Sequence, residues 1–298
     1  VRGSDVTLAH ITITRAVDHL IHATTKSGGG TVKGLRFYGL RLIDGGEQFI
    51  KINHVDNSGY VDDSRVECSY FELTAAGRPH IEPNPGGCYT GGIDAHSSRG
   101  WVVRHNTFIG IHCENGGLAE HAVHFWRSSR DTLVENNTII NCARGVGFGL
   151  GDQGGTRVYA DNPYGDDKLG HYDGVIRNNV IYADNPWFDT GIELQNTKTP
   201  QVYHNTIVIG AGATGFFSSI DSRYAKSETI VVNNLTTKIS ERGGAKATKS
   251  NNLVNVGLDL FVAATMRDFH LKADAASAID KGKSLPDGGL DIDAEKHD

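Results

Sequence analysis

Two ionisable residues share one face of a short predicted strand, within the segment GGIDAHSSRGWVVRHNTFIGIHC at residues 91–113. A β-strand sends successive side chains to opposite faces, so Asp94 and His96 face one way while Ile93 and Ala95 face the other. We expect the apolar face to be buried, which leaves a carboxylate and an imidazole on the outer face. Groups of these types transfer protons or hold polar ligands.

Similar strands recur along the chain, and aligning them on their first buried apolar residue predicts which outer residues are neighbours. The inner column contains Ile21, Ile50, Ile93, Val123, Val146, Ile192 and Phe216. The first outer column contains His22, Lys51, Asp94, His124, Gly147, Glu193 and Phe217, and the second contains Thr24, Asn53, His96, Trp126, Gly149, Gln195 and Ser219. Because adjacent strands lie about 4.8 Å apart, we expect Lys51, Asp94 and His124 to stand side by side.

Long insertions occur around the same strands, at residues 75–90, 113–122 and 151–174. Long loops on a rigid scaffold commonly form the walls of binding sites. We therefore expect a groove beside the polar columns, with a floor made bare by the glycines of RGVGFGLGDQGG. The residues expected to contact a ligand in it are Trp126, which could stack on a sugar ring, together with Tyr89, His121, Arg127, Glu193 and Gln195.

Two groups of residues could in principle bind a metal ion. Glu120, His121 and His124 form an E-H-x-x-H string, but the zinc motif of that form needs a helix, and on a strand the two histidines should face opposite ways. We therefore expect no zinc site there. Calcium is the ion that the acidic loop YADNPYGDDKLGHYDG could hold, through Asp161, Asp166, Asp167 and Asp173, although an acidic loop is also ordinary solvated surface.

A repeated unit of a short apolar strand, an asparagine and a second short strand runs through the chain. The asparagines are Asn106, Asn137, Asn179, Asn205, Asn234 and Asn252. Since asparagine tolerates the left-handed backbone region, we expect each to occupy the same tight turn. Three short strands per repeat without amphipathic helices predict an all-β fold, a parallel β-helix. The whole chain, 1–298, reads as one such domain, with a terminal capping segment at about 257–298.

The asparagine-turn repeats, together with FHLKADAASAIDKG near the end, resemble secreted bacterial right-handed parallel β-helix proteins of the pectate-lyase-like superfamily. In many of these proteins a similar F-x-L … S-x-A-I-D-x-G segment closes the last coil. The resemblance covers nearly the whole chain and implies a single-domain right-handed solenoid. The superfamily includes lyases, hydrolases, epimerases, esterases and adhesins, so the fold alone does not select an activity. The chain lacks the Asp-Asp and Gly-His-Gly motifs of the polygalacturonase-like hydrolases and the arginine signature of pectate lyases.

The reaction that we expect is β-elimination on a uronic-acid-containing polysaccharide. A lyase needs a base for the proton next to the carboxyl group and a cation for the resulting charge. His124 or Lys51 could be the base, Arg127 or His96 the cation, and Asp94 and Glu120 complete the catalytic candidates. A glycoside hydrolase remains an alternative through Asp94 and Glu120, whereas Asp94 and Glu193 would be about 14 Å apart, beyond the roughly 6.5–9.5 Å that inversion needs. A non-catalytic glycan-binding or surface module is the second alternative.

The overall composition narrows the class of partner and the compartment. The 298 residues carry a net charge of −6, which argues against nucleic-acid binding, and no stretch of roughly 18 apolar residues predicts a membrane span. The chain begins at Val1 without a leader, so we expect a processed protein that is secreted or periplasmic. Cys88 and Cys113 lie in glycine-rich loops of consecutive repeats and could form a disulfide or stay as free thiols. We expect a monomer whose partner is a polysaccharide or oligosaccharide.

Overall fold

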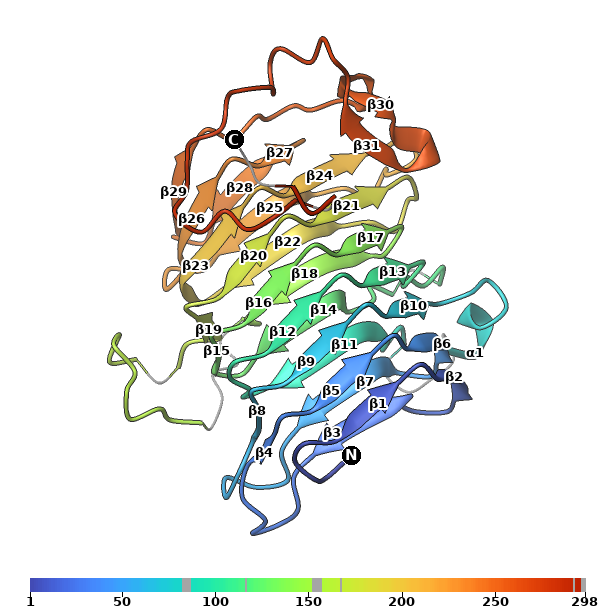
Figure 1. Cartoon of the computed structure of the whole chain (residues 1–298), viewed down its shortest axis with the longest axis vertical. Helices are drawn as coiled ribbons and strands as arrows, with labels where there is room; N and C mark the ends of the chain where they lie inside the picture. The colour runs from blue at the N-terminus through green and yellow to red at the C-terminus, as the bar shows by residue number, and fades with distance from the viewer. Residues whose placement is uncertain (82–86, 116, 152–156, 167, 292, 296–298) are drawn as a thin grey trace.

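A computed structural model describes residues 1–81, 87–115, 117–151, 157–166, 168–291 and 293–295. Each coil contributes one short strand to each of three parallel sheets, which run along the long axis of the molecule (Figure 1). The chain therefore forms a parallel β-helix, as the three-strand repeat predicted. Among the described residues, no helix is long and apolar enough to cross a membrane.

The strands of each sheet follow one another in coil order. The first sheet contains β1 (Thr7–Ala9), β5 (Arg36–Tyr38), β9 (Arg65–Glu67), β12 (Val102–Arg104), β16 (Leu133–Glu135), β20 (Val175–Arg177), β23 (Thr197–Tyr203), β26 (Glu228–Val232) and β29 (Lys246–Ser250), with β15 (Ser129–Arg130) and β19 (His171–Tyr172) alongside β23. The second contains β2 (Thr12–Ala16), β6 (Arg41–Gly45), β10 (Tyr70–Glu72), β13 (Thr107–Ile109), β17 (Thr138–Ile140), β21 (Val180–Ala183), β24 (Thr206–Ile209) and β27 (Leu235–Thr236). The third contains β3 (Ile21–Thr24), β7 (Gln48–Asn53), β11 (Gly91–His96), β14 (His121–Trp126), β18 (Arg144–Phe148), β22 (Thr190–Gln195), β25 (Ser218–Arg223) and β28 (Ile239–Arg242).

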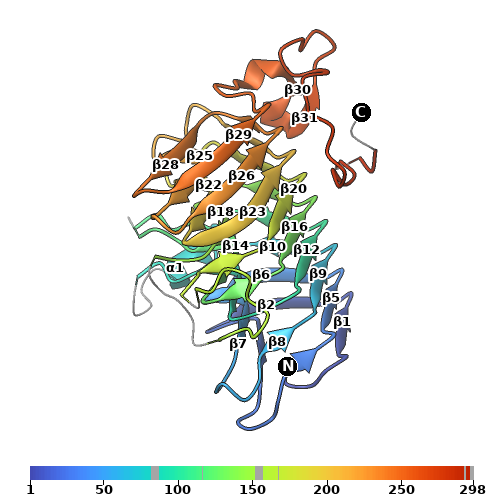
Figure 2. The same ribbon diagram turned by 90° about the vertical axis from the view of Figure 1, so that its left-hand side faces the viewer.

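The remaining elements are short and lie outside these sheets. They are the parallel pair β4 (Val32–Lys33) and β8 (Val61–Asp62), the antiparallel pair β30 (Phe261–Ala263) and β31 (Asp268–Leu271), the helix α1 (Arg78–Ile81), and two 3₁₀ turns at Leu258–Leu260 and Ala264–Met266. The turned view shows the coils stacked on one another, with β30 and β31 at the C-terminal end (Figure 2).

The asparagine column lies in the turn between the first and second sheets, but its role differs from the predicted one. The left-handed backbone belongs to the preceding residue of each repeat, for example His105 (φ 55°) and Asn136 (φ 53°). Asn106 and Asn137 instead point inward, where the backbone N–H and the side-chain amide of Asn106 each donate to Asn137 Oδ1 at 3.0 Å. The same pattern joins Asn137 to Asn179 and continues to Asn252. The prediction that these asparagines adopt the left-handed region was therefore wrong, because they are kept for a buried hydrogen-bond ladder.

Alternation in the third sheet breaks at one position in each of the middle coils. In β7, both Phe49 and Ile50 are fully buried, and Phe49 stacks on Phe71 of the second sheet. In β11, a Cβ on Gly92 would meet the ring of Phe108 in the core, although the next residue, Ile93, is also buried there. The strand bends where two consecutive residues point inward. The residue just before this inward pair and the residue just after it therefore both point outward. A strict period of 2 therefore holds only from Ile50 or Ile93 onward.

The register of the third sheet matches the predicted columns through β22 and departs from them in β25. Lys51, Asp94 and His124 are paired neighbours, followed by Gly147 and Glu193. In β25, however, Ile192 pairs with Ile220 and Glu193 with Asp221. The placement of Phe216 and Phe217 in these columns was wrong, because both residues precede the strand and the sequence SIDSR supplies the repeat.

The C-terminal segment packs along the side of the solenoid. Phe261 and Ala264 join Ile140 and Val208 on the outer face of the second sheet, in a small apolar cluster. Residues 281–291 then run back over the left-handed turns, where side-chain amides hold their carbonyl groups. The bonds join Asn136 to Leu290, Asn178 to Gly288, Asn233 to Lys283 and Asn251 to Lys281. The predicted capping segment is thus a lateral strap whose carbonyl groups are satisfied by the repeat's own asparagines.

Cys88 and Cys113 form a disulfide, with Cα atoms 5.8 Å apart, so the disulfide alternative of the sequence analysis is confirmed. The bond joins the two insertions that precede β11 and β14. Cys142 is a free, buried thiol whose pKa burial raises to about 12, and Cys68 is a free, exposed one. The disulfide therefore fastens the loops beside the third sheet.

Candidate functional site on the outer face of the third sheet

The middle coils of the third sheet carry a cluster of charged side chains on the outer face that is largely covered by loops. The side chains of Lys51 and Asp94 are only 6% and 5% exposed. Each of the three insertions makes a hydrogen bond to this face. The Tyr89 hydroxyl accepts from Lys51, the Ala119 carbonyl accepts from Arg144, and the backbone N–H of Gly151 donates to Gln195. The predicted loops thus enclose the columns.

Asp94 is the centre of the first half of this cluster. Its carboxylate accepts hydrogen bonds from the Lys51 ammonium and, at 2.6 Å, from the Trp126 indole N–H. His96 Nε2 lies 3.2 Å away and His124 Nδ1 lies 3.8 Å away. Burial by itself would raise the pKa of Asp94, but the hydrogen bond with His96 and the Lys51 charge hold that pKa far below its usual range. Asp94 is therefore an anion that organises its neighbours.

Lys51 is placed to hold charge. Burial alone would lower its pKa, but the attraction of Asp94 and the contact with Tyr89 raise that pKa above its usual value. Its ammonium also lies 3.1 Å from His96 Nε2 and 3.4 Å from the Tyr89 hydroxyl. A lysine that stays protonated cannot accept a substrate proton, so these contacts favour a charge-holding role over the predicted role as base.

His121 and His124 lie on the same outer face, contrary to the sequence analysis. The bend described above falls between Ala122 and Val123, which are both fully buried, so the residues on either side of this pair both point outward. Their rings are 4.4 Å apart. The expectation that these histidines face opposite ways was wrong, because it assumed an unbroken alternation along β14.

Three charged residues surround His121 and His124. Glu120 Oε2 lies 3.5 Å from His124 Nδ1 and 3.9 Å from His121 Nδ1. On the other side of the His121 ring, Nε2 contacts Glu193 Oε2 at 3.0 Å, and Arg144 lies 3.3 Å from the same oxygen. His124 Nε2 contacts the Gly149 carbonyl at 3.0 Å. The cluster therefore continues across β14, β18 and β22 without a break.

The two histidines have opposite pKa shifts. Burial and the nearby Arg144 lower the pKa of His121 to about 4, so its ring is neutral at pH 7. Burial also disfavours a charged His124, but Glu120 and Asp94 outweigh that effect and raise its pKa. For Glu120 burial opposes the charged form, yet His124 and Arg144 lower the pKa to about 2. With both ring nitrogens engaged, His124 is better placed to hold charge than to meet a substrate as a base.

The remaining predicted ligand contacts divide into accessible and buried residues. Tyr89 is 37% exposed and the Glu120 side chain 25% exposed, so both can meet a ligand. Trp126 is partly exposed, but His124 stacks parallel to its ring and the Arg127 guanidinium lies 5.2 Å from the ring centroid. Glu193 and Gln195 are buried among protein partners. They support the site from within.

Sequence reasoning missed three charged residues of this face. Arg144 joins Glu193 and lies 3.7 Å from Glu120 Oε2, whereas Arg242 binds the fully buried Asp221 at 2.8 Å. Alignment of SIDSR with GIELQ on their isoleucines would have found Asp221. Arg144 could be found only once the bend of the strand was known, since it precedes two inward residues.

Each of the three predicted calcium ligands that the structure describes has a separate protein partner. Asp161 pairs with Arg130, Asp166 pairs with Lys226, and Asp173 accepts from Thr199. Asp167 lies outside the described residues. Calcium binding by this loop stays a prediction that no contact among the described acidic groups supports.

A cavity of about 850 Å³ also lies away from the cluster, between the turn ladder and residues 267–293.

The His121 ring lies against Gly147 and leaves no space for a side chain at that position. A Cβ at this position would lie 2.7 Å from His121 Nε2, so the floor that was predicted to be bare is filled by an imidazole. We expect Gly147→Ala to displace the ring and to lower the free energy of unfolding by about 1–3 kcal/mol, the usual cost of overpacking. Urea denaturation measures the loss, and histidine side-chain NMR reports the ring.

Gly3→Ala is the matched control, because a Cβ there has only an ordinary contact at 3.8 Å, with Val6. Its stability should equal that of the parent protein. If Gly147→Ala unfolds at the same urea concentration as Gly3→Ala, with an unchanged His121 signal, the ring does not depend on that glycine.

Comparison with known families identifies the repeat. The model of a family described as the right-handed β-helix region matches residues 1–236, which include all of the coils that carry the polar cluster. Searches of curated proteins and of solved structures find no match. The match covers most of the chain and agrees with the three parallel sheets.

Proposed function

The chain belongs to the right-handed β-helix family, and on this premise we propose that the outer face of its third sheet binds a uronic-acid-containing polysaccharide and cleaves it by β-elimination. The family is typical of carbohydrate-active and surface proteins. The observation that carries the proposal is Tyr89, an exposed residue at the rim of the cluster whose hydroxyl lies 3.4 Å from the buried Lys51 ammonium. A hydroxyl beside a fixed cation suits a sugar ring that bears a carboxylate.

The roles follow from accessibility. The Tyr89 oxygen takes the proton next to the uronate carboxyl, and the same hydroxyl returns a proton to the departing glycosidic oxygen as the C–O bond breaks, since tyrosine is one of the side chains that serve as general bases and acids. Lys51, held by Asp94, supplies positive charge beside that hydroxyl, and His96 lies within 3.1 Å of the same ammonium. Such preorganised charge stabilises the electron density that gathers on the carboxyl group during elimination. The partly exposed Arg127 extends the positive surface next to Trp126.

The disulfide supports the proposal of an oxidising compartment. Disulfides persist in secreted and periplasmic proteins and are rare in the cytosol. The Cys88–Cys113 bond fastens the loop that carries Tyr89. This bond supports a location outside the cytosol, and we propose that the protein acts there as a monomer on a polysaccharide.

Degradation of uronic-acid polysaccharides tests this function. The parent protein should produce new reducing ends together with the ultraviolet absorbance of unsaturated uronates. Tyr89→Phe should slow the reaction by about 10²–10⁴-fold, the usual contribution of a general base, while binding of the polymer is retained. Tyr70→Phe, which removes a half-buried hydroxyl from the second sheet, is the control and should be fully active.

Two other outcomes would replace this function with its alternatives. Reducing ends without unsaturation would indicate hydrolysis, with Glu120 and Asp94 as the carboxyl pair. Retention on an immobilised glycan without turnover would indicate a binding module. An elimination rate that Tyr89→Phe leaves unchanged would remove Tyr89 from the role of base.

A further inference from the structure

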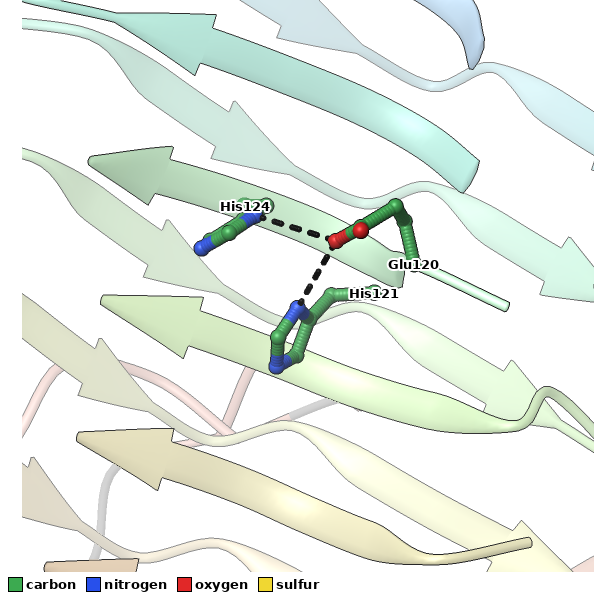
Figure 3. A group of neighbouring side chains, drawn as sticks. All are labelled: Glu120, His121 and His124. Atoms are coloured by element: carbon green, nitrogen blue, oxygen red, sulfur yellow. Dashed lines mark ion pairs between the residues drawn. The ribbon is translucent and has the colours of Figure 1, made fainter. Parts of the chain in front are cut away.

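Three potential metal ligands converge at the start of β14 (Figure 3). The donor atoms of Glu120, His121 and His124 lie within 4.8 Å of one another. Figure 3 shows both imidazoles turned toward the Glu120 carboxylate, and the contacts are 3.5 Å to His124 Nδ1 and 3.9 Å to His121 Nδ1. Among the described residues this is the one group of three histidine, cysteine or acidic side chains with such spacing.

Two of the converging atoms lack hydrogen bonds. His121 Nδ1 and Glu120 Oε2 are buried, and neither has a hydrogen-bond partner within the described part of the chain. The His121 side chain is only 1% exposed, so bulk water does not satisfy its nitrogen. A buried polar atom without a partner costs about 1–3 kcal/mol in other proteins. A cation between these atoms would satisfy both.

The opposite nitrogens of both rings are fixed by acceptors. His121 Nε2 is 3.0 Å from Glu193 Oε2, and His124 Nε2 is 3.0 Å from the Gly149 carbonyl. A carbonyl oxygen can only accept, so His124 Nε2 carries a proton, and a carboxylate imposes the same form on His121. When both rings are neutral, as metal ligands must be, their Nδ1 lone pairs point toward Glu120. Histidine ligands of metals characteristically have such a carboxylate or carbonyl behind them.

The surrounding charges also suit a cation. With neutral imidazoles, the carboxylates of Asp94, Glu120 and Glu193 exceed the positive charges of Lys51 and Arg144 by one. Arg144 remains 3.7 Å from Glu120 Oε2 and competes for that oxygen. A proton on His124 would also restore the balance, and this is the competing explanation for the cluster.

We propose that Glu120, His121 and His124 bind one divalent first-row transition ion such as Zn²⁺. Imidazole nitrogens with a carboxylate suit zinc and its neighbours better than calcium. Three protein ligands leave coordination positions for water or an oxygen ligand, as in catalytic zinc sites. This inference does not rest on the proposed lyase function. It departs from the sequence-based expectation of no zinc site, whose reason fails because the bend in β14 brings both histidines to one face.

Calorimetric titration of chelator-treated protein with Zn²⁺ tests the site directly, without any polysaccharide. We expect one ion per chain, and cobalt substitution should give the visible absorption of a nitrogen- and oxygen-ligated ion. Glu193→Gln should weaken binding by about 10–100-fold, the effect of losing an outer-shell partner. His121→Gln and Glu120→Gln each replace a ligand and should weaken binding by more than Glu193→Gln does.

His112→Gln is the matched control, because it also replaces a buried histidine, one that stacks on Trp187 away from the cluster. It should bind Zn²⁺ as the parent protein does. Far-ultraviolet circular dichroism identifies the variants that remain folded. The proposal is overturned if the parent protein binds no Zn²⁺, or if folded His121→Gln or Glu120→Gln binds as tightly as His112→Gln.

Discussion

Asp94→Asn should lower the free energy of unfolding by about 3–5 kcal/mol, because it leaves a buried ammonium without its carboxylate. Lys51 and Asp94 are almost fully enclosed, so water cannot replace the lost charge. The asparagine keeps an oxygen for the Trp126 indole, which restricts the loss mainly to the charge. Equilibrium unfolding in urea measures the effect.

Lys51→Met separates the ion pair from other effects of the substitution. Combined with Asp94→Asn it removes both charges, so the double variant should lose less stability than the sum of the two single losses. The difference should fall within about 0.5–3 kcal/mol, as for other contacting pairs. Additive losses would show that the two groups do not stabilise each other, and that Asp94 acts mainly through Trp126 and His96.

Asn137→Ala should also lower the free energy of unfolding by about 3–5 kcal/mol. Its side-chain oxygen accepts from both the backbone and the side chain of Asn106, and its amide nitrogen lies within 3.0 Å of the carbonyls of Val103 and Glu135. Asn137 is fully buried, so alanine leaves several of these groups unpaired, at about 1–3 kcal/mol each. The urea midpoint should fall accordingly.

Asn252→Ala is the corresponding substitution at the last rung of the ladder. This residue accepts from Asn234 but is only half-buried, so water can reach the groups that it leaves. Its loss should be clearly smaller than that of Asn137→Ala. Equal losses in the free energy of unfolding for the two variants would mean that burial does not determine how much each asparagine stabilises the protein.

Much of the fold could be predicted because it repeats. The recurring asparagine units determine three strands per coil, and the apolar residues in register predicted that Lys51, Asp94 and His124 are neighbours. The disulfide partners were also named, although their bonding was left open. These predictions rest on local alternation and on the recurrence of similar short strands, which a single sequence displays directly.

The sequence could not show where each strand bends. Ala122 and Val123 are both compatible with an inward or an outward position, so β14 alone does not reveal that both are inside. Packing in the core decides which residues point inward. At the position equivalent to Ala122 in the adjacent strands, Phe108 and Ile181 occupy the space that a side chain at Gly92 or Gly145 would need. The same limit applied to the asparagine column. Asparagine is suited to the left-handed turn, but here the preceding residue adopts that turn and the asparagine forms the hydrogen-bond ladder.

What the sequence by itself determined is the solenoid, its coil register through β22 and the residue types of the polar columns. Only the tertiary structure decided that His121 joins His124, that Arg144 belongs to the same face, and that loops cover this face. The physical reason is that alternation is a rule of straight strands. Packing contacts between residues far apart in the sequence set the bends, and the bends determine which side chains meet.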